Sequence, residues 1–547
     1  MDDRVESLLQ RQQDLESDRS TLEAHWREIA ERVLPRQKGF NEVLTPGEKR
    51  QDKIFDGTPE LALIRFASAM ESMLTPRTQR WAKLQAQAMD LVDDIEIRRY
   101  FDELNEIMFR IRYAPKANFQ SSMHENYMGL GAFGTGCLFI DEAVGTGIRY
   151  RQIHLGELYL AEDHTGRIDT VHRKFEYTAR QAVQAFGMSN LPPKIADAAE
   201  KGDKKKFCFV HCVSPNEDRK MGNRDYRGMP ISSYYMSLDE RAIISEGGYR
   251  TMPYAVSRYV KSPTEVYGRS PAMSALADIK MLNEIEKTVL RQAHRITDPP
   301  LLLQDDGVLR AFSVRPNALN YGALDGQGNP RVRPMDTQGN LNVGLEVGDR
   351  KRQQVNEHFL VNLFQILVEN PQMTATEALI RAQEKGQLIA PVVGRQQSEL
   401  LGAVIERELD ILSQVPGLLP EMPKALRDAG GEYAIEYTSP INRAMRAEDG
   451  VAIMRTLEAV TPWAQIDPTV LDAFDPEAVV RELAEVNGMP AKTIRDAKTI
   501  AALRAQREQQ INAQQLLAAM PAMSQSAKNI AQAAAVDQSA GPVAGVA

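Results

Sequence analysis

The chain has 547 residues, of which 43% are hydrophobic and 26% are charged, and its 66 basic and 74 acidic side chains give a formal net charge of −8 at pH 7. This balance is typical of a globular protein with several cores, and it excludes a protein that holds nucleic acid by neutralising phosphates over its whole surface. No run of about 18 apolar residues could span a bilayer, and the start of the chain lacks the apolar core of a secretion signal, so we expect a soluble intracellular protein.

The N-terminal part is predicted to be helical. Apolar residues recur at spacings of seven, four and three from Val5 to Leu34, which predicts an amphipathic helix that Pro35 ends. Because the repeat lasts less than four heptads, we interpret this helix as packed on its own domain rather than as a free coiled coil. Thr58 is the expected cap of a second helix that runs to about Leu74, and two more helices are expected near 95–112 and 118–130.

Composition shifts toward strands at Gly136. Between Gly136 and Val260, short runs of β-branched and aromatic residues are separated by turn signals, with one helix expected at about 178–186. The lysine-rich stretch 201–206 is interpreted as a solvated connection to the strand 207–213. The sequence therefore predicts a mixed α+β body after the helical start.

The most informative pattern lies between Tyr267 and Ser398. Ser270 caps a predicted helix from Pro271 to Ile296, an insert rich in Gly, Pro and Asn spans 301–342, and a second helix runs from about Val347 to Val368. A helix pair with a small β-insert at its far end cannot bury its apolar stripe within one subunit. We therefore expect neighbouring copies to cover it, as in the wall of a ring.

The rest of the chain is predicted to be helical with one strand. In chain order we expect a polar break at 369–373, a short helix capped by Thr374 or Thr376, an amphipathic helix after Pro391, a strand at 432–440, and helices from Asn442 to about Gln514. The tail from about Pro521 is rich in Ala, Gln and Ser, and we assign it no fixed structure.

A glycine cluster from Gly129 to Gly134 matches the letter pattern of a dinucleotide-binding loop. That chemistry needs a strand before the glycines and a helix after them, whereas here a helix precedes and a strand follows. We interpret the cluster as a structural turn whose glycines allow close packing.

The cysteines and histidines do not predict a metal site. Three cysteines are too few for a disulfide framework, so we expect reduced thiols. On one strand, Cys208 and Cys212 would share a face while His211 points to the other, and no second ligand pair lies at a suitable spacing. No metal and no cofactor are expected.

Common catalytic signatures are absent from the sequence, including the Walker, HExxH, GxSxG and calcium-loop patterns. Adjacent acids such as Asp93-Asp94 and Asp305-Asp306 lie in polar or turn contexts and are interpreted as solvated faces or caps. Nothing in the sequence requires an enzyme.

Basic residues follow both long helices of the hairpin. Lys287, Arg291 and Arg295 recur at i, i+4 and i+8 on the first helix, and the second carries Arg350, Lys351 and Arg352 near its start. Glu284 and Glu286 lie close enough to pair with the first set. Both interpretations stay open: a surface that faces a polyanion, and an ordinary solvated helix face.

Four segments carry a resemblance that covers most of the chain: FDGTPELALIRFASAMESMLTPRTQRWAKL, NFQSSMHENYMGLGAFGTGCLFIDE, EVYGRSPAMSALADIKMLNEIEKTVLRQAHRITDPPLLLQDDGVL and TATEALIRAQEKGQLIAPVVGRQQSELLGAVIERELDIL. Together they resemble the portal, or head-to-tail connector, proteins of short-tailed double-stranded DNA bacteriophages (podoviruses). The resemblance implies an α+β, predominantly helical portal fold with wing, stem, clip and crown, assembled as a ring around a central channel.

The resemblance also implies domain boundaries and site residues. The implied domains are a wing at 1–263, a first stem helix at 264–300, a clip at 301–342, a second stem helix at 343–368, a tunnel loop and tunnel helix at 369–390, a further part of the wing at 391–442, a crown at 443–515 and a flexible tail at 516–547. The tunnel loop would present Glu369, Asn370, Gln372, Met373 and Thr374 to the channel, and the clip would dock partners through Arg310, Arg315, Tyr321, Arg331 and Arg333. The six basic stem residues would be the DNA-facing ones.

The implied function is mechanical. A ring at one capsid vertex would let DNA in and out, docking first the packaging ATPase, which is the terminase large subunit and hydrolyses the ATP, and then tail adaptor or nozzle proteins. An acidic subunit suits this role because like charge lets DNA slide, while sparse basic rings such as Arg291 or Arg295 would contact it.

The resemblance also implies partners and a location. The partners are further copies of the chain, twelve in family members, major capsid and scaffolding proteins, and internal core proteins, with no membrane. The location is the virion, after assembly in the host cytoplasm. Two alternatives stay open: a self-associating scaffold or internal virion protein, and a cytosolic nucleotide-binding enzyme.

Overall fold

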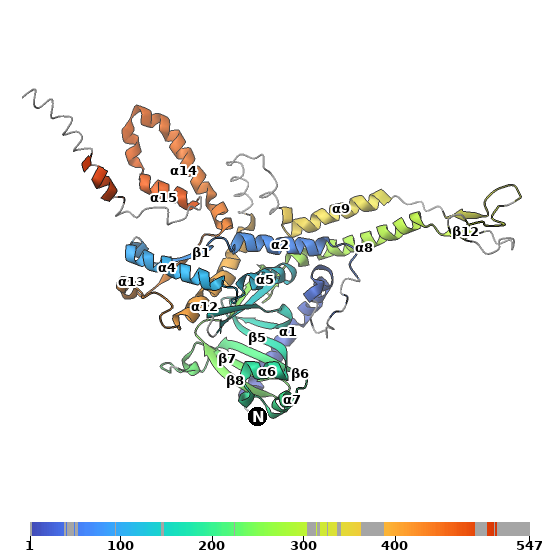
Figure 1. Ribbon diagram of the computed structural model, residues 1–547, viewed down its shortest axis with the longest axis horizontal. Coiled ribbons are helices and arrows are strands. Elements are labelled where there is room, and N and C mark those ends of the chain that lie inside the picture. Colours follow the sequence, from blue (N-terminus) through green and yellow to red (C-terminus); the bar gives the residue numbers. More distant parts are fainter. Residues whose placement is uncertain are drawn as a thin grey trace, which may run out of the picture. The chain divides into compact units, whose positions relative to one another are not determined.

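The computed structural model describes residues 3–37, 40, 47, 49, 53–92, 94–143, 147–223, 225–303, 313, 315, 318–324, 326–335, 341–362, 388–486, 500, 502–507 and 509–510. The chain forms two compact units, Met1–Met445 and Arg446–Ala547, and each is described by itself. The described residues combine long helices with small antiparallel sheets (Figure 1), which confirms the predicted α+β, predominantly helical class.

The N-terminal helices confirm the predicted order. They are α1 (Asp3–Val33), α2 (Thr58–Leu74), a short α3 (Met89–Val92), α4 (Ile95–Arg112) and α5 (Phe119–Phe133). The cap of α2 differs from the prediction, because Gly57 is the capping residue and Thr58 is already helical. The carboxylate of Asp56 accepts a hydrogen bond of 2.7 Å from the backbone N–H of Thr58. It therefore satisfies a free N–H group at the start of α2, the role predicted for the Thr58 hydroxyl.

The β-rich body contains a three-stranded and a five-stranded antiparallel sheet. The first has the order β3-β2-β9 and the second the order β4-β5-β6-β7-β8. Their strands are β2 (Thr135–Ala143), β3 (Gly147–Gln152), β4 (Leu158–Glu162), β5 (Ile168–Thr178), β6 (Lys206–Pro215), β7 (Ile231–Ser237), β8 (Ala242–Tyr249) and β9 (Tyr254–Arg258). Val5 of α1 packs on one face of the larger sheet, while α6 (Ala179–Phe186) and α7 (Pro193–Glu200) cover the other. Of these two helices, the sequence predicted only α6. Helix α7 is eight residues long and buries only Ile195, so it has no apolar pattern that would indicate a helix.

The predicted hairpin is present. Helix α8 (Pro271–Thr297) begins as expected, with the Ser270 hydroxyl accepting a hydrogen bond of 2.9 Å from the backbone N–H of Met273. Strands β12 (Leu301–Leu303) and β13 (Val332–Pro334) pair in the insert, and α9 (Leu341–His358) returns antiparallel to α8. Two short pairs of strands, β10 (Val260–Lys261) with β11 (Gly268–Arg269) and β1 (Ala82–Ala86) with β14 (Tyr433–Tyr437), complete the sheets of the described residues.

The second long helix departs from the predicted range 347–368, because α9 begins earlier, at Leu341, and is broken after His358. Residues 361–362 are helical again, and 363–368 lie outside the described residues. At its end Leu360 has a φ of +58°, which no regular helix contains. Phe359 and Val361 are both buried, at 0% and 2% exposure, and a straight helix cannot bury two residues that are two positions apart on one side. The left-handed residue turns the chain so that both are buried.

The C-terminal helices follow the prediction with one irregularity. Residues 388–395 are helical, so this helix begins before Pro391 rather than after it, and a π-helix, η5 (Gln396–Leu401), continues it into α12 (Gly402–Ser413). A short helix, α13 (Lys424–Asp428), precedes β14. The second unit contains most of α14 (Pro440–Ile466), followed by α15 (Pro476–Val486). The predicted tail from about Pro521 lies outside the described residues.

A histidine–carboxylate contact joins α2 to α5 and gives a pH-dependent prediction. Nδ1 of His124 lies 2.8 Å from Oε2 of Glu71, and this hydrogen bond raises the pKa of His124, against the opposing effect of burial. A raised folded-state pKa gives stability that is present below the unfolded pKa and is lost as pH rises through the folded one. Glu71→Gln should therefore lower the melting temperature at about pH 5.5 and have less effect at about pH 8.5. Thermal melts at both pH values test this, with exposed Glu103→Gln as the control; an equal loss at both would contradict it.

Candidate functional site: the α8–α9 hairpin

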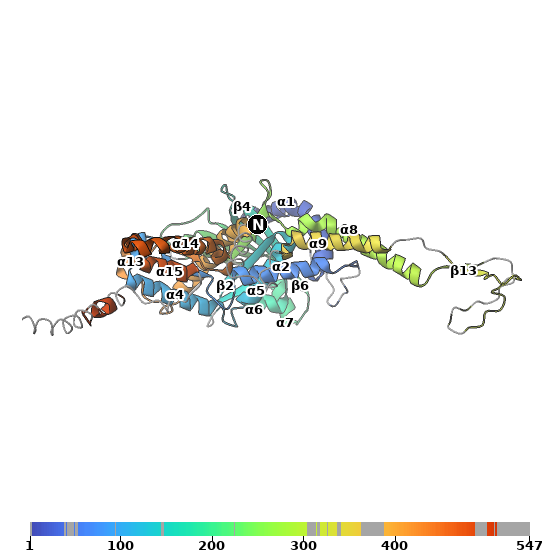
Figure 2. The same cartoon turned by 90° about the horizontal axis from the view of Figure 1, so that it is seen from above.

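The two helices of the hairpin lie side by side (Figures 1 and 2) because glycines let their backbones approach. Gly344 and Gly348 are four residues apart on α9 and both face α8. A Cβ atom at Gly344 would lie 2.7 Å from Cγ2 of Val289, and one at Gly348 would lie 2.9 Å from Oε1 of Glu286. A side chain at Gly344 would collide with the short, branched Val289, whereas one at Gly348 would first displace the flexible Glu286 carboxylate.

A segment we name the strap, residues 53–57, crosses the base of the hairpin. The Asn283 amide of α8 donates to the Lys53 carbonyl at 2.9 Å and accepts from the Phe55 backbone N–H at 2.7 Å. The Asp56 carboxylate of the strap accepts from Nε of Arg352 on α9 at 2.9 Å. The strap is thus tied to both helices of the hairpin.

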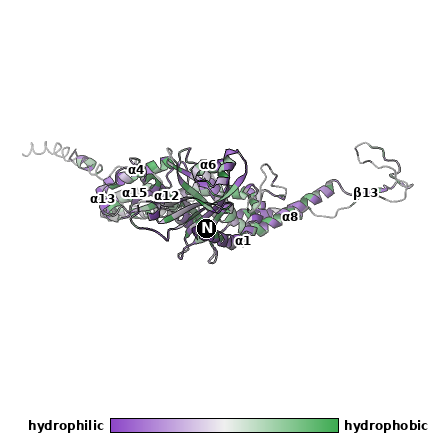
Figure 3. Ribbon diagram, turned by 90° about the horizontal axis from the view of Figure 1, so that it is seen from below, coloured by the Kyte–Doolittle hydropathy of each residue, from purple (hydrophilic) through white to green (hydrophobic). Residues whose placement is uncertain are grey.

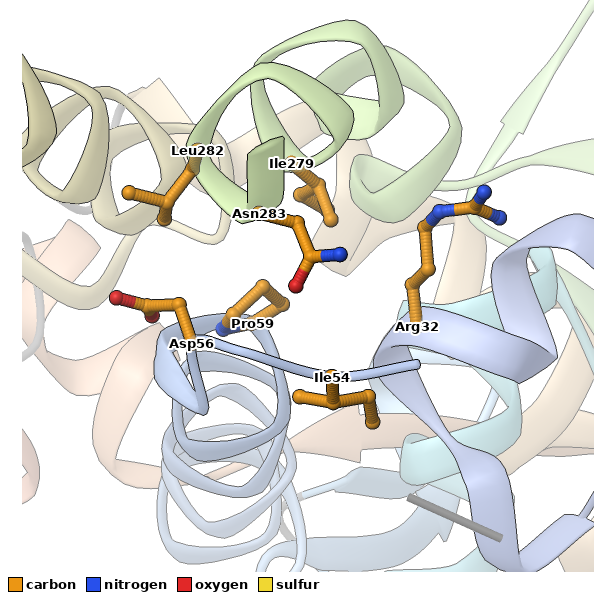
Figure 4. Close-up of a pocket in the computed structure, with 7 residues that line it drawn as sticks. All are labelled: Arg32, Ile54, Asp56, Pro59, Ile279, Leu282 and Asn283. Carbon is orange, nitrogen blue, oxygen red and sulfur yellow. The ribbon is translucent and has the colours of Figure 1, made fainter. Parts of the chain in front are cut away.

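A small pocket lies where the strap meets α1, α2 and α8. Its lining residues are Arg32, Ile54, Asp56, Pro59, Ile279, Leu282 and Asn283. In Figure 4 the charged groups of Asp56 and Arg32 stand at opposite ends and point away from each other. The Asp56 carboxylate is already held by Arg352 and by the N-terminus of α2. The lining contains no nucleophile beside a base, so we interpret the pocket as a structural junction.

Three of the six predicted basic stem residues are neutralised within the chain. Nζ of Lys351 lies 2.8 Å from Oδ1 of Asp278, and this hydrogen bond lowers the pKa of that carboxyl. Arg352 pairs with Asp56, with Glu286 of α8 and with Asp349. Lys287 lies 3.3 Å from Glu284, and its ammonium group stands 5.7 Å from the centre of the Phe55 ring.

The other three basic stem residues are exposed. Arg291, Arg295 and Arg350 have no ion pair with any residue that the structure describes. Of the two acids close to the basic stripe, Glu284 pairs with Lys287, whereas Glu286 pairs across the hairpin with Arg352. Unpaired arginine and lysine side chains on the described residues of α8 and α9 are therefore limited to these three arginines.

The predicted tunnel and clip residues are only partly placed. Arg315 and Tyr321 are exposed, Arg333 is an exposed residue of β13, and Arg331 precedes that strand. Arg310 and the tunnel-loop residues Glu369, Asn370, Gln372, Met373 and Thr374 lie outside the described residues, as does the short helix expected after them.

Two irregular helix joints flank residues 363–387, and sequence patterns missed both. Leu360 ends α9 in the left-handed conformation, and η5 interrupts the helix that leads into α12. The π-turn is held from outside the helix, since the Tyr437 hydroxyl donates to the Gln397 carbonyl at 2.8 Å. The apolar spacing of Val355, Phe359 and Leu363 is regular through the first joint, so periodicity carries no signal of the break.

Substitution of Leu360 tests the first joint. At a right-handed helical position Ala is more stable than Gly by about 1 kcal/mol. At Leu360 the order should be reversed, because only Gly adopts a φ of +58° without strain. We expect Leu360→Gly to be more stable than Leu360→Ala by about 1 kcal/mol, measured as the free energy of unfolding in urea. Gln353→Gly and Gln353→Ala at an exposed helical position are the control, and there the Ala variant should be the more stable one. A more stable Ala variant at Leu360 as well would mean that the helix is continuous.

The residues weighed as metal or nucleotide ligands have structural roles. Cys208 and Cys212 share one face of β6, and His211 lies on the other, bonded to the hydroxyls of Tyr254 and Ser233 at 2.7 and 2.9 Å. Burial holds the pKa of His211 well below its ordinary value. Within the described residues no group of three His, Cys, Asp or Glu side chains could hold a metal ion.

The glycine cluster confirms the structural interpretation, because α5 ends there and β2 begins. Gly134 caps α5 with a φ of +79°, and a Cβ atom at Gly131 would lie 2.6 Å from Leu63 of α2. No strand leads into the cluster and no helix N-terminus follows it, so it does not have the geometry of a phosphate-binding loop.

Comparison with known proteins identifies the family. The sequence profile of the family described as bacteriophage head to tail connecting protein matches residues 5–494. The chain belongs to this family. The connector is 29% identical over 544 residues to the probable portal protein of Bordetella phage BPP-1, covering 97% of this chain and 96% of that one. It is 27% identical over 543 residues to the portal protein of Salmonella phage epsilon15, with coverages of 98% and 97%, and 24% identical over 478 residues to that of Enterobacteria phage T3, with coverages of 83% and 81%.

The family gives the connector its function. It is a structural component of the phage particle at the junction of head and tail, where a portal provides the channel for DNA and the platform on which other components dock. The described part of the chain has no helix long and apolar enough to cross a membrane. The predicted function is thereby confirmed at the level of the family.

Proposed function

We propose that copies of this connector, twelve as the resemblance implies, close into a ring whose neck is built from the α8–α9 hairpins. The observation that supports this proposal is the exposed apolar surface along this hairpin. Hydrophobic and hydrophilic residues alternate along α8 in Figure 3, and the exposed large apolar residues of the two helices are Met281, Leu290, Ile296, Val343, Leu345 and Val347. Six such side chains on one projecting hairpin indicate a surface that another chain covers.

The contacts of the hairpin support a choice of the helix that would face the axis of the ring. Helix α8 packs against α1, α2 and α5, and Lys280 of α8 pairs with Glu28 of α1, whereas α9 packs chiefly against α8 and α2. Figure 1 shows α9 on the far side of α8 from α1 and the larger sheet. A closed ring has more room outside than at its axis, so the bulky body lies outside and α9 lines the channel.

This arrangement changes which cations would meet DNA. Arg291 lies three helical turns beyond Lys280 on the same stripe of α8, so it faces the outside, and Arg295 follows it one turn later. The edge of α9 opposite Gly344 and Gly348 carries Glu346, Arg350, Gln353 and Glu357, all exposed. Two carboxylates and one arginine would give a channel wall that repels DNA overall and holds it only briefly.

The remaining predicted sites extend this proposal. Residues 369–374 would reach into the channel, and the insert around Arg315, Tyr321, Arg331 and Arg333 would dock the terminase large subunit and later the tail adaptor or nozzle proteins. Capsid, scaffolding and internal core proteins would meet the wider part of the ring, during assembly in the host cytoplasm. The chain itself would catalyse no reaction, because its partner would hydrolyse the ATP.

Negative-stain microscopy of the purified full chain tests the ring. We expect closed rings with a central hole. A population of monomers and irregular aggregates would favour a self-associating scaffold protein and would overturn the proposal.

DNA packaging by phage particles that carry variant connectors tests the assignment of the channel wall. Glu346→Gln with Glu357→Gln should alter packaging or DNA retention, because it removes both carboxylates from the channel edge of α9, whereas Arg291→Gln with Arg295→Gln should leave both unchanged. The opposite pattern would place α8 at the axis.

A further inference from the structure

Helix α9 carries two stripes with the same spacing, and all their residues are exposed except Arg352, which is partly buried. The far stripe is Val343, Val347 and Arg350, and the strap stripe is Leu345, Asp349 and Arg352; each follows the pattern i, i+4, i+7. Two positions along an α-helix turn a side chain by about 200°, so the stripes lie on nearly opposite sides of α9 at almost the same height.

Contacts with α8 fix the side on which each stripe lies. Arg352 reaches Glu286 of α8 and Asp56 of the strap, so the strap stripe is on the side of the hairpin that the strap crosses. Lys351, four residues after Val347, reaches Asp278 of α8 from the other flank, so the far stripe is on the side away from the strap.

Helix α8 extends both surfaces. Met281, 51% exposed, lies three residues after Asp278 and continues the side of the far stripe. Leu290, 45% exposed, lies four residues after Glu286 and continues the side of the strap stripe, where Phe55 of the strap is also exposed. Each side of the hairpin therefore has its own patch of exposed apolar residues.

The two sides are complementary to each other. Val343 and Val347 on one side lie at the same height along the hairpin as Leu345 on the other. In a contact between two copies, these apolar side chains would therefore pack against each other. Arg350, which has no ion pair with any described residue, stands level with Asp349, whose side chain is 71% exposed although it pairs with Arg352. An opposite charge at the same height is what a head-to-tail contact between identical hairpins requires.

We propose that the far stripe of one copy packs against the strap stripe of the next copy around the ring. This proposal rests on the ring proposed above and assigns the surfaces that join its subunits. Rotation about an axis parallel to the hairpin keeps every residue at its own height, so residues of equal height meet, and the contact repeats until the ring closes. An unrelated partner would have no reason to match a charge and an apolar patch on both sides of one hairpin.

Disulfide trapping of the full chain tests this contact. The variant Val347→Cys with Leu345→Cys, in a Cys208→Ser background because Cys137 and Cys212 are buried, should form under oxidation a ladder of covalent multimers that ends at the size of the ring. Each cysteine alone should give no multimers, because a head-to-tail contact needs both. The matched control, Val347→Cys with Gln353→Cys at the channel edge, should give no ladder.

The outcomes separate this inference from the proposed function. Rings seen by microscopy without a ladder from the Val347→Cys, Leu345→Cys variant would overturn the assigned surfaces and leave the ring intact. Dimers from a single cysteine variant would mean a two-fold contact and would also overturn them. Absence of rings in the unmodified chain would overturn the ring itself.

Charge exchange provides a second readout. Arg350→Asp should shift rings toward monomers in size-exclusion chromatography, and adding Asp349→Arg should restore the rings because the pair is re-formed with reversed sign. Failure of the second substitution to restore them would show that the two residues do not meet.

Discussion

Arg112→Met should destabilise the first unit by about 3–5 kcal/mol, the cost of leaving a buried carboxylate without its partner. Nε and Nη2 of Arg112 donate to the two oxygens of Glu408 at 2.8 and 2.6 Å, and the two side chains are only 5% and 1% exposed. The Tyr150 hydroxyl donates to the same carboxylate at 2.6 Å, and the Arg112 guanidinium lies 4.5 Å from the centre of the Trp81 ring. These contacts join α4, β3, α12 and Trp81, the residue that precedes β1, and these parts are far apart in the sequence.

The measurement is the free energy of unfolding in urea, with an exposed pair as the control. Arg80 and Glu106 form an ion pair of 3.2 Å with 38% and 73% of the side chains exposed, so Arg80→Met should cost less than about 1 kcal/mol. Adding Glu408→Leu to Arg112→Met should recover much of the lost stability, because no buried charge is then left unpaired. A loss no larger than that of Arg80→Met would show that water reaches Glu408.

Burial and the neighbouring Glu408 carboxylate also raise the pKa of Tyr150 well above its ordinary value. The phenol therefore stays protonated and donates to the carboxylate. Arg112→Met removes the cation that pairs with Glu408. Of the contacts described above, only the neutral Tyr150 hydroxyl would still donate to the carboxylate. The predicted loss of stability is large for this reason.

Local signals in the sequence predicted the elements whose ends are set by neighbouring residues. Ser270 before Pro271 indicated the start of α8, and the apolar spacing before Pro35 indicated α1. Elements whose ends depend on distant contacts were missed. Leu360 ends α9 because Phe359 and Val361 are both buried by other parts of the chain, and nothing within α9 indicates it.

The hairpin itself was predictable, but its partners were not. Six basic residues on two helices suggested a surface for a polyanion, yet Lys351 and Arg352 are bound to carboxylates of other segments. The strap has no periodic pattern, so the sequence alone does not indicate that Asp56 and Asn283 tie it to the hairpin. One signal was available: Gly344 and Gly348, four residues apart in a helix, indicate a close helix contact at the surface they share.

Gly134→Ala should be the most damaging small substitution in the glycine cluster, costing about 3 kcal/mol. Gly134 has a φ of +79°, and a Cβ atom there would lie 2.4 Å from the carbonyl oxygen of Gly268, which is backbone and cannot move aside. The Gly134 carbonyl also accepts from the Tyr259 N–H at 2.9 Å, so a shift of this residue would disturb the end of β9 as well. Thermal melts of the purified chain would show the loss.

Gly129→Ala is the matched control, because it lies in the same cluster but inside α5. A Cβ atom at Gly129 would meet its nearest atoms at 3.7 and 3.9 Å, which are ordinary contacts, and Ala favours a helix over Gly by about 1 kcal/mol. Gly129→Ala should therefore be neutral or stabilising. A phosphate-binding loop would behave differently: magnesium ATP would raise the melting temperature of the unmodified chain, and both substitutions would abolish that rise. A connector whose glycines serve only packing should show no effect of the nucleotide and a large difference between the two alanine variants.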